Sequence, residues 1–172
     1  QQSTPVLDRS ALTEAPLTHV QKRMWLLEQR SQVPHIIRAV FAISGALDSV
    51  RLENALSKVV AQNAILRVLV AEKPSGIYQV INEQLQGSDY FSCIHCSYDE
   101  VTAQIQTILS KPFQDNESLF QAYLLKLNND NYRLVLKVHH LIADGVSMQK
   151  ILAQLTLYYE NSQEALLDCQ VF

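Results

Sequence analysis

Two adjacent histidines, His139 and His140, stand a short distance before Asp144 and Gly145 in the segment VHHLIADGVS. The segment lies where an apolar strand pattern ends and a helical pattern begins, and loops at such places carry sites on a rigid scaffold. An imidazole at the strand end can serve as a general base, while the Gly permits a sharp turn or the close approach of a substrate. The pattern indicates a base-positioning turn. The alternative is a pair of structural histidines beside an Asp144 that caps the helix.

The elements on either side of this segment are expected to hold it in place. The runs FQAYLLKL and YRLVLKV flank the polar residues 128–131, which predicts a hairpin whose second strand leads into the histidines. After Gly145 the apolar residues recur at helical spacing to about Glu160. These residues are Met148, Ile151, Leu152, Leu155 and Tyr159.

The rest of the chain alternates helices with strands. The expected elements are a helix over 18–30 that begins with a capping box of Thr18 and Gln21, a strand over 35–43, a helix capped by Asp48, a hairpin of 65–72 with 77–82, a strand over 90–95, and a helix after Ser97 that ends before Pro112. Because tight turns join several strands, we predict an α/β sandwich (α+β) with a mixed, largely antiparallel sheet packed against helices. No Walker or G-x-G-x-x-G loop suggests a nucleotide-binding fold.

Composition suits one compact domain or one lobe of a larger domain. Of the 172 residues, 48% are hydrophobic and 18% are charged, and the net charge of −3 makes nucleic acid an unfavoured partner. No apolar run approaches the roughly 18 residues of a membrane span, and the start lacks the pattern of a signal peptide. We therefore expect a cytoplasmic protein with no membrane contact. Residues 1–16 are expected to form an extended lead-in, and 161–172 a polar tail.

The cysteines include a C-x-x-C pair, Cys93 and Cys96. A zinc site would need a second Cys or His pair at suitable spacing, and the sequence offers none. We expect no metal site and interpret the pair as ordinary buried or half-buried thiols.

The histidine segment resembles H-H-x-x-x-D-G, the signature of condensation domains of non-ribosomal peptide synthetases, in the chloramphenicol-acetyltransferase-like superfamily. The segment THVQKRMWLL, residues 18–27, is similar to the family's first motif, S-x-A-Q-x-R-M-W-x-L. Further segments placed as in the family are Gly45–Asp48, Ile65–Arg67 and Lys111–Phe113, so the resemblance covers Leu17 to Tyr159. The second motif departs from the family at Gln62–Ala64, although Arg67 is kept, and Ala143 replaces a common Ser.

The resemblance implies amide formation between a donor acyl or peptidyl thioester and an acceptor aminoacyl thioester. Both substrates would be carried on phosphopantetheine arms of peptidyl carrier proteins, and the domain itself would bind no cofactor. Residues 17–160 would form the N-terminal lobe of a two-lobed domain. The C-terminal lobe and an adenylation domain would be its neighbours, and this lobe alone would be inactive.

Each residue of the signature then has an expected role. His140 would orient the acceptor amine and accept its proton, with Gly145 beside it, while His139 would pack inward and hold the loop. Asp144 would pair with a buried arginine, Arg67 before Arg23, rather than act in a catalytic relay. The alternative for either arginine is an ordinary solvated side chain.

Two other functions remain open. One is a standalone acyltransferase of the same superfamily, which would use a coenzyme A thioester and a small alcohol or amine. The other is a non-catalytic interaction lobe. The altered Gln62–Ala64 stretch favours that second alternative, and the complete H-H-x-x-x-D-G pattern argues against it.

Overall fold

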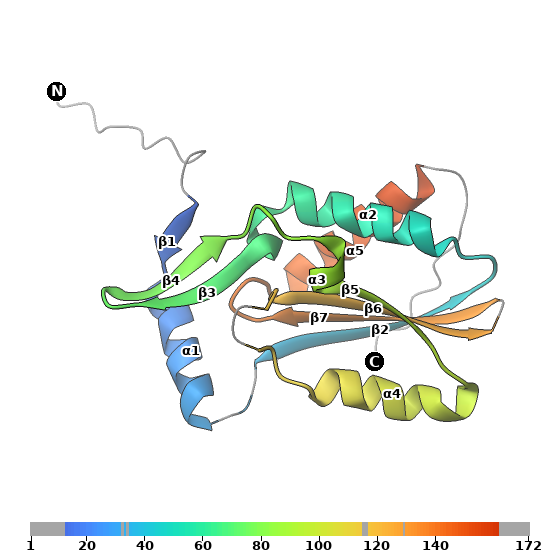
Figure 1. Ribbon diagram of the computed structural model, residues 1–172, viewed down its shortest axis with the longest axis horizontal. Helices are drawn as coiled ribbons and strands as arrows, with labels where there is room; N and C mark the ends of the chain where they lie inside the picture. The colour runs from blue at the N-terminus through green and yellow to red at the C-terminus, as the bar shows by residue number, and fades with distance from the viewer. Residues whose placement is uncertain (1–12, 32, 34, 115–116, 129, 162–172) are drawn as a thin grey trace.

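The computed structural model describes residues 13–161 except 32, 34, 115–116 and 129 (Figure 1). Its elements are, in chain order, β1 (Glu14–Pro16), α1 (His19–Ser31), β2 (Ile36–Ser44), α2 (Ser49–Gln62), the 3-10 helix η2 (Ala64–Arg67), β3 (Val68–Lys73), β4 (Gly76–Ile81), α3 (Gly87–Tyr90), β5 (Phe91–His95), α4 (Tyr98–Ser110), β6 (Phe120–Asn128), β7 (Asn131–His139) and α5 (Gly145–Glu160).

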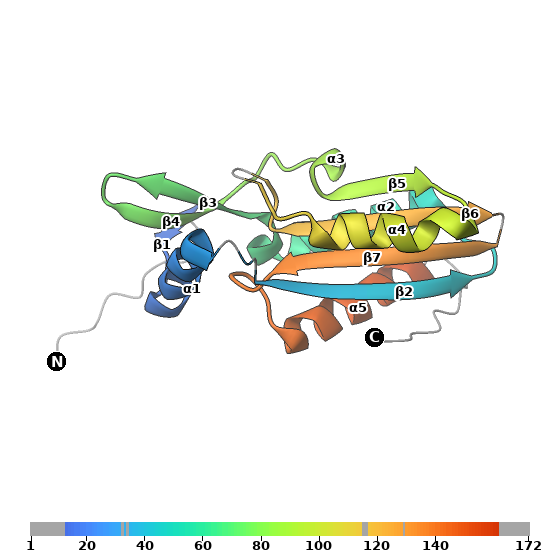
Figure 2. The same ribbon diagram turned by 90° about the horizontal axis from the view of Figure 1, so that it is seen from below.

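A four-stranded sheet forms the centre of the molecule, in the order β2-β7-β6-β5. Strand β5 runs parallel to β6, while the other two pairs are antiparallel. Helices α2 and α5 cover one face of this sheet and α4 covers the other (Figures 1 and 2). The predicted class, a mixed and largely antiparallel sheet packed against helices, is confirmed.

The two faces of the sheet have separate cores because side chains alternate along each strand. Leu124 and Leu136 pack with α2 and α5 in the main cluster, whereas Leu125 and Val135 pack against α4. Burial on both faces explains why β6 and β7 are nearly continuous apolar runs. Strand β7 lies between two neighbours, so the segment that follows it starts from a well-fixed position.

A second, three-stranded sheet has the order β1-β4-β3 and lies beside α1 (Figure 1). The expected hairpin is present, but its first strand begins only at Val68, because 64–67 turn as η2. Strand β1 falls within the expected lead-in and pairs with β4. The lead-in before residue 13 and the polar tail after residue 161 lie outside the described residues.

Most of the expected helix starts are confirmed. Thr18 and Gln21 bond reciprocally, Asp48 accepts hydrogen bonds from the first turn of α2, and Ser97 with Glu100 forms a capping box. Over the described ranges, no helix is long and apolar enough to cross a membrane.

Candidate active site

The two histidines begin a tight connection between β7 and α5, here called the histidine turn (residues 139–145). Its backbone is tied to neighbouring segments. The His140 N–H donates to the carbonyl of His35 at 2.8 Å, and the His139 N–H donates to that of Leu119 at 2.9 Å. Within the turn, the Ile142 N–H donates to the His139 carbonyl at 3.0 Å. The start of the turn is therefore fixed by the scaffold.

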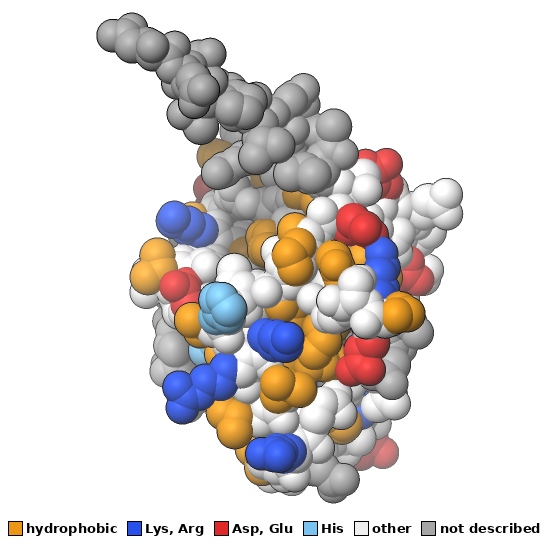
Figure 3. Space-filling view, turned by 90° about the vertical axis from the view of Figure 1, so that its left-hand side faces the viewer, with side chains coloured by type: hydrophobic (Ala, Val, Ile, Leu, Met, Phe, Trp, Pro, Cys, Tyr) orange, Lys and Arg blue, Asp and Glu red, His pale blue; other side chains and the backbone are white. Residues whose placement is uncertain are grey.

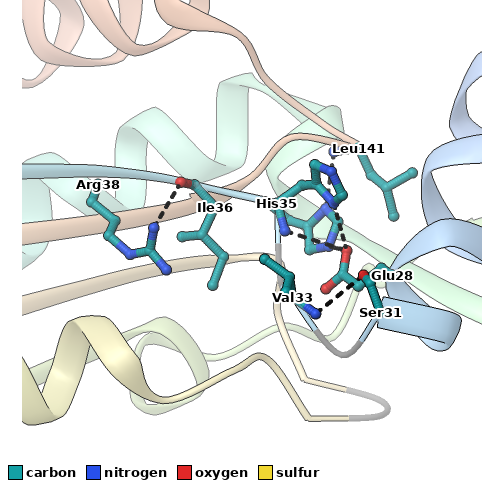
Figure 4. Close-up of polar contacts among 8 residues, drawn as sticks. Glu28, Ser31, Val33, His35, Ile36, Arg38 and Leu141 are labelled. Atoms are coloured by element: carbon teal, nitrogen blue, oxygen red, sulfur yellow. Dashed lines mark hydrogen bonds and ion pairs between the residues drawn. The ribbon is translucent and has the colours of Figure 1, made fainter.

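His139 packs inward, as expected, with 1% of its surface exposed. Its Nδ1 accepts a hydrogen bond from the Leu141 N–H at 3.0 Å, so its proton resides on Nε2. Nε2 lies 2.9 Å from Oε2 of Glu28 in α1 and donates to it (Figure 4). Burial lowers the pKa of His139, although the Glu28 carboxylate opposes that shift. A neutral imidazole with a hydrogen bond at each ring nitrogen thus anchors the turn.

His140 presents the opposite situation. Its residue is exposed, and the described residues give its ring no hydrogen bond or ion pair. Its backbone, however, is held by the bond to His35. The turn therefore offers one free imidazole on a fixed backbone, which is the arrangement that a general base or a positioning group requires.

Asp144 does not form the expected ion pair. Its carboxylate caps α5, accepting from the backbone N–H of Ser147 at 2.8 Å and from the Ser147 hydroxyl at 2.7 Å. These bonds lower the pKa of Asp144. Across the described parts of the chain no ion pair joins Asp144 to Arg67 or Arg23. The prediction of a pair is wrong in this structure, because an exposed carboxylate three residues from its cap partners needs no buried countercharge.

The other predicted residues lie apart from the turn or beside it. Arg67 is the last residue of η2 and is half-buried, with its Nε buried and lacking a hydrogen-bond partner, and Arg23 is exposed on α1.

Gly145 is the first residue of α5 and does not have a positive φ. A Cβ added at Gly145 would meet nothing within 4 Å. The turn itself therefore does not require glycine, and the open space beside it leaves room for a substrate.

Two residues of α1 reach the turn and were not singled out from the sequence for this role. Glu28 bonds His139, and the Gln21 Nε2 donates to the Leu141 carbonyl at 2.9 Å. Gln21 was noted as part of a capping box and of the segment that resembles the family's first motif, without a contact to the histidines. The spacing of Gln21 and Glu28 places both on one helix face, since residues seven apart lie on the same side of a helix. No local pattern, however, indicates what that face contacts.

The cysteine pair shows no binding site. Cys96 is half-buried as expected, but Cys93 is exposed, so that prediction is wrong for Cys93. Strand β5 has β6 on one side only and lies at the edge of the sheet, which leaves its outer positions open. No group of three or more His, Cys, Asp or Glu in the described residues is placed to hold a metal ion.

Comparison with known proteins gives a consistent family. The family model described as "Condensation domain" matches residues 11–169. Surfactin synthase subunit 2 of Bacillus subtilis is 31% identical over 151 residues, which is 86% of this chain and 4% of that protein. Nonribosomal peptide synthetase dtpA of Aspergillus flavus is 31% identical over 145 residues, covering 84% of this chain and 5% of that protein.

Solved structures share the fold at low identity. The starter condensation domain of rhizomide synthetase RzmA superposes with a TM-score of 0.76 at 20% identity, covering 92% of this chain and 40% of that one. The X-domain in complex with OxyB, from teicoplanin biosynthesis, gives a TM-score of 0.80 at 22% identity, covering 98% and 38%. The chain thus spans about two fifths of these domains and a few per cent of its relatives in sequence. By the family match over most of its length, the chain belongs to the condensation domain family.

Proposed function

We propose that residues 17–160 form the N-terminal lobe of a condensation domain of a non-ribosomal peptide synthetase and supply its catalytic turn. The reaction joins a donor acyl or peptidyl thioester to the amine of an acceptor aminoacyl thioester. The observation that carries this proposal is the contrast between the two histidines. The His139 ring is buried and makes two hydrogen bonds, while His140 is exposed on a fixed backbone.

In the proposed mechanism, the neutral acceptor amine attacks the donor carbonyl and a new C–N bond forms. His140 orients the amine and accepts the proton that its nitrogen loses. The C–S bond then breaks, and the departing sulfur takes up the proton that His140 accepted and leaves as the thiol of the donor's phosphopantetheine arm. An amine with a pKa near 8 leaves enough neutral nucleophile at pH 7, so His140 need not generate it. A group of this kind contributes roughly 10²- to 10⁴-fold in rate.

The proposed partners are donor and acceptor peptidyl carrier proteins, the C-terminal lobe and a neighbouring adenylation domain, all within the cytoplasm. Surface chemistry supports large covering partners. Helix α1 buries no side chain completely and exposes Val20, Leu26 and Leu27. Figure 3 shows hydrophobic and basic side chains mixed on the end of the molecule where α1 lies. Val146, just past the histidine turn, is also exposed.

Two observations keep the alternatives in view. A starter condensation domain of rhizomide synthetase has been solved in complex with C8-CoA. That similarity of fold is the reason to test a coenzyme A thioester as donor. The X-domain, similar in fold, has been solved in complex with OxyB, which is the reason to test for a non-catalytic lobe.

The deciding experiment uses the complete domain that contains this chain. It is given the same acyl group either on a carrier protein or as a coenzyme A thioester, with an aminoacyl carrier as acceptor, and products are read by mass spectrometry. We expect amide formation from the carrier-bound donor. Turnover of the coenzyme A thioester alone with a small free acceptor would favour the standalone acyltransferase, and no amide from any pair would favour the interaction lobe.

A further inference from the structure

Helix α1 contacts the histidine turn at two points. Gln21 and Glu28 are seven residues apart, about 10.5 Å along a helix axis, and therefore lie on the same face of α1. Both reach the turn, although more than a hundred residues separate them from it in sequence. The contacts are polar and specific, in a helix that buries no side chain completely.

These contacts converge on Leu141. Glu28 Oε2 accepts from His139 Nε2 at 2.9 Å, and His139 Nδ1 in turn accepts from the Leu141 N–H at 3.0 Å. On the other side of the same residue, the Leu141 carbonyl accepts from Gln21 Nε2 at 2.9 Å. The Leu141 N–H belongs to the peptide that joins it to His140. The helix therefore fixes the backbone that follows His140, while the bond to His35 fixes the backbone that precedes it.

Glu28 is suited to this task by its surroundings. Its side chain is 17% exposed and faces two imidazoles, His139 at 2.9 Å and His35 Nδ1 at 3.7 Å. A carboxylate can only accept, so it keeps the His139 proton on Nε2 and leaves Nδ1 free for the Leu141 N–H. If that acceptor were lost, the buried Nε2–H of His139 would have no partner, and rotation of the His139 ring would be favoured.

We propose that Glu28 and Gln21 are positioning residues for His140, acting through His139 and Leu141 to set the backbone of the histidine turn. This inference rests on the proposed function of His140. Neither residue touches the reacting atoms in this scheme. Their effect is to hold the His140 ring in one direction, and a misplacement of about 1 Å can cost 10²-fold in rate.

The helix has other attachments, so the two contacts can be removed without releasing it. Met24 and Trp25 pack against the main core, and the Trp25 indole N–H donates to Glu72 in β3 at 3.3 Å. Substitutions can therefore be chosen that change the contacts of one side chain at a time, although those of Glu28 include a longer bond from the His35 N–H to its Oε2 at 3.5 Å. Glu28→Leu keeps the size but removes the acceptor, whereas Glu28→Gln keeps an acceptor oxygen. Gln21→Glu keeps the oxygen that accepts from Thr18 and removes the donor to Leu141.

The experiment measures these variants in the complete domain, with Gln29→Ala as the control, since Gln29 is an exposed neighbour on α1. Amide formation gives kcat and the KM for each carrier, and hydrogen exchange with mass spectrometry follows the peptide that contains the histidine turn. We expect Glu28→Leu and Gln21→Glu to lower kcat about 10- to 100-fold with KM changed less than about twofold. The turn should exchange about tenfold faster in both. Glu28→Gln and Gln29→Ala should stay near wild type.

Unchanged exchange in the turn of Glu28→Leu, or an unchanged kcat, would overturn the proposal. Loss of kcat in Glu28→Gln equal to that in Glu28→Leu would overturn it too, since the acceptor oxygen is kept. Failure of the proposed function shows itself differently, as no amide from the wild-type domain. The exchange measurement does not depend on chemistry, so in that case it still decides whether α1 holds the turn.

Discussion

The two adjacent histidines should respond to truncation in opposite ways. His139→Ala removes a ring that is 1% exposed and lies 5.8 Å, centroid to centroid, from the Phe113 ring. It leaves the Leu141 N–H without its acceptor and leaves Glu28 with the longer bond from the His35 N–H at 3.5 Å. An unpaired buried group costs about 1–3 kcal/mol, and loss of a buried ring about 3–5 kcal/mol in all. His140→Ala removes an exposed ring without such bonds, which costs within about 0.5 kcal/mol.

Urea unfolding of the complete domain, read beside amide formation, separates these effects. Both variants should lose most of their activity, but only His139→Ala should lose about 3–5 kcal/mol of unfolding free energy. His19→Ala, at an exposed position on α1, is the control and should change neither quantity. Equal destabilisation by the two histidine variants, or a His139→Ala domain as stable as wild type, would refute the division of roles.

Three further outcomes are expected. Asp144→Ala should destabilise the start of α5, and Asp144→Asn should do so less because its side-chain oxygen can still accept. In a double-mutant cycle, the losses of stability from Asp144→Ala and Arg67→Ala should add, since the two residues are not paired. A large coupling energy would restore the expected ion pair. Burial lowers the pKa of Lys137 to about 8, so the unfolded chain binds more protons between about pH 8 and 10.5 and the fold gains stability as pH rises through that window. Denaturation of wild type and Lys137→Met across this range should show a gain of up to about 3 kcal/mol in wild type alone, and parallel curves would contradict it. Finally, residues 1–172 alone should melt cooperatively but form no amide from two loaded carriers, and robust turnover would favour the standalone acyltransferase.

The elements with local signals were predictable. A helix start can be predicted locally, because the N-cap side chain accepts a hydrogen bond from a backbone N–H only two or three residues later. The caps at Asp48 and Ser97 are examples. The strong β-formers either side of residues 128–131 likewise led to the β6-β7 hairpin. Because that hairpin and α5 could both be located, the histidine turn between them could be placed correctly.

Long-range partners were not predictable in the same way. The ion pair of Asp144 was inferred from the cost of burying charge, but the carboxylate is exposed and finds Ser147 three residues away. Glu28 is 111 residues from His139, and no spacing rule connects them. Division of the strands into two sheets also escaped the sequence, since alternation along a strand shows which face is apolar but not which strand lies beside it.

The most direct measurement of the proposed role of His140 is the single-turnover rate of amide formation by the complete domain, with saturating donor and acceptor carriers. We expect His140→Ala to lower this rate by roughly 10²- to 10⁴-fold while the unfolding free energy stays at the wild-type value. A near-normal rate in His140→Ala would contradict both the proton transfer and the positioning assigned to this imidazole.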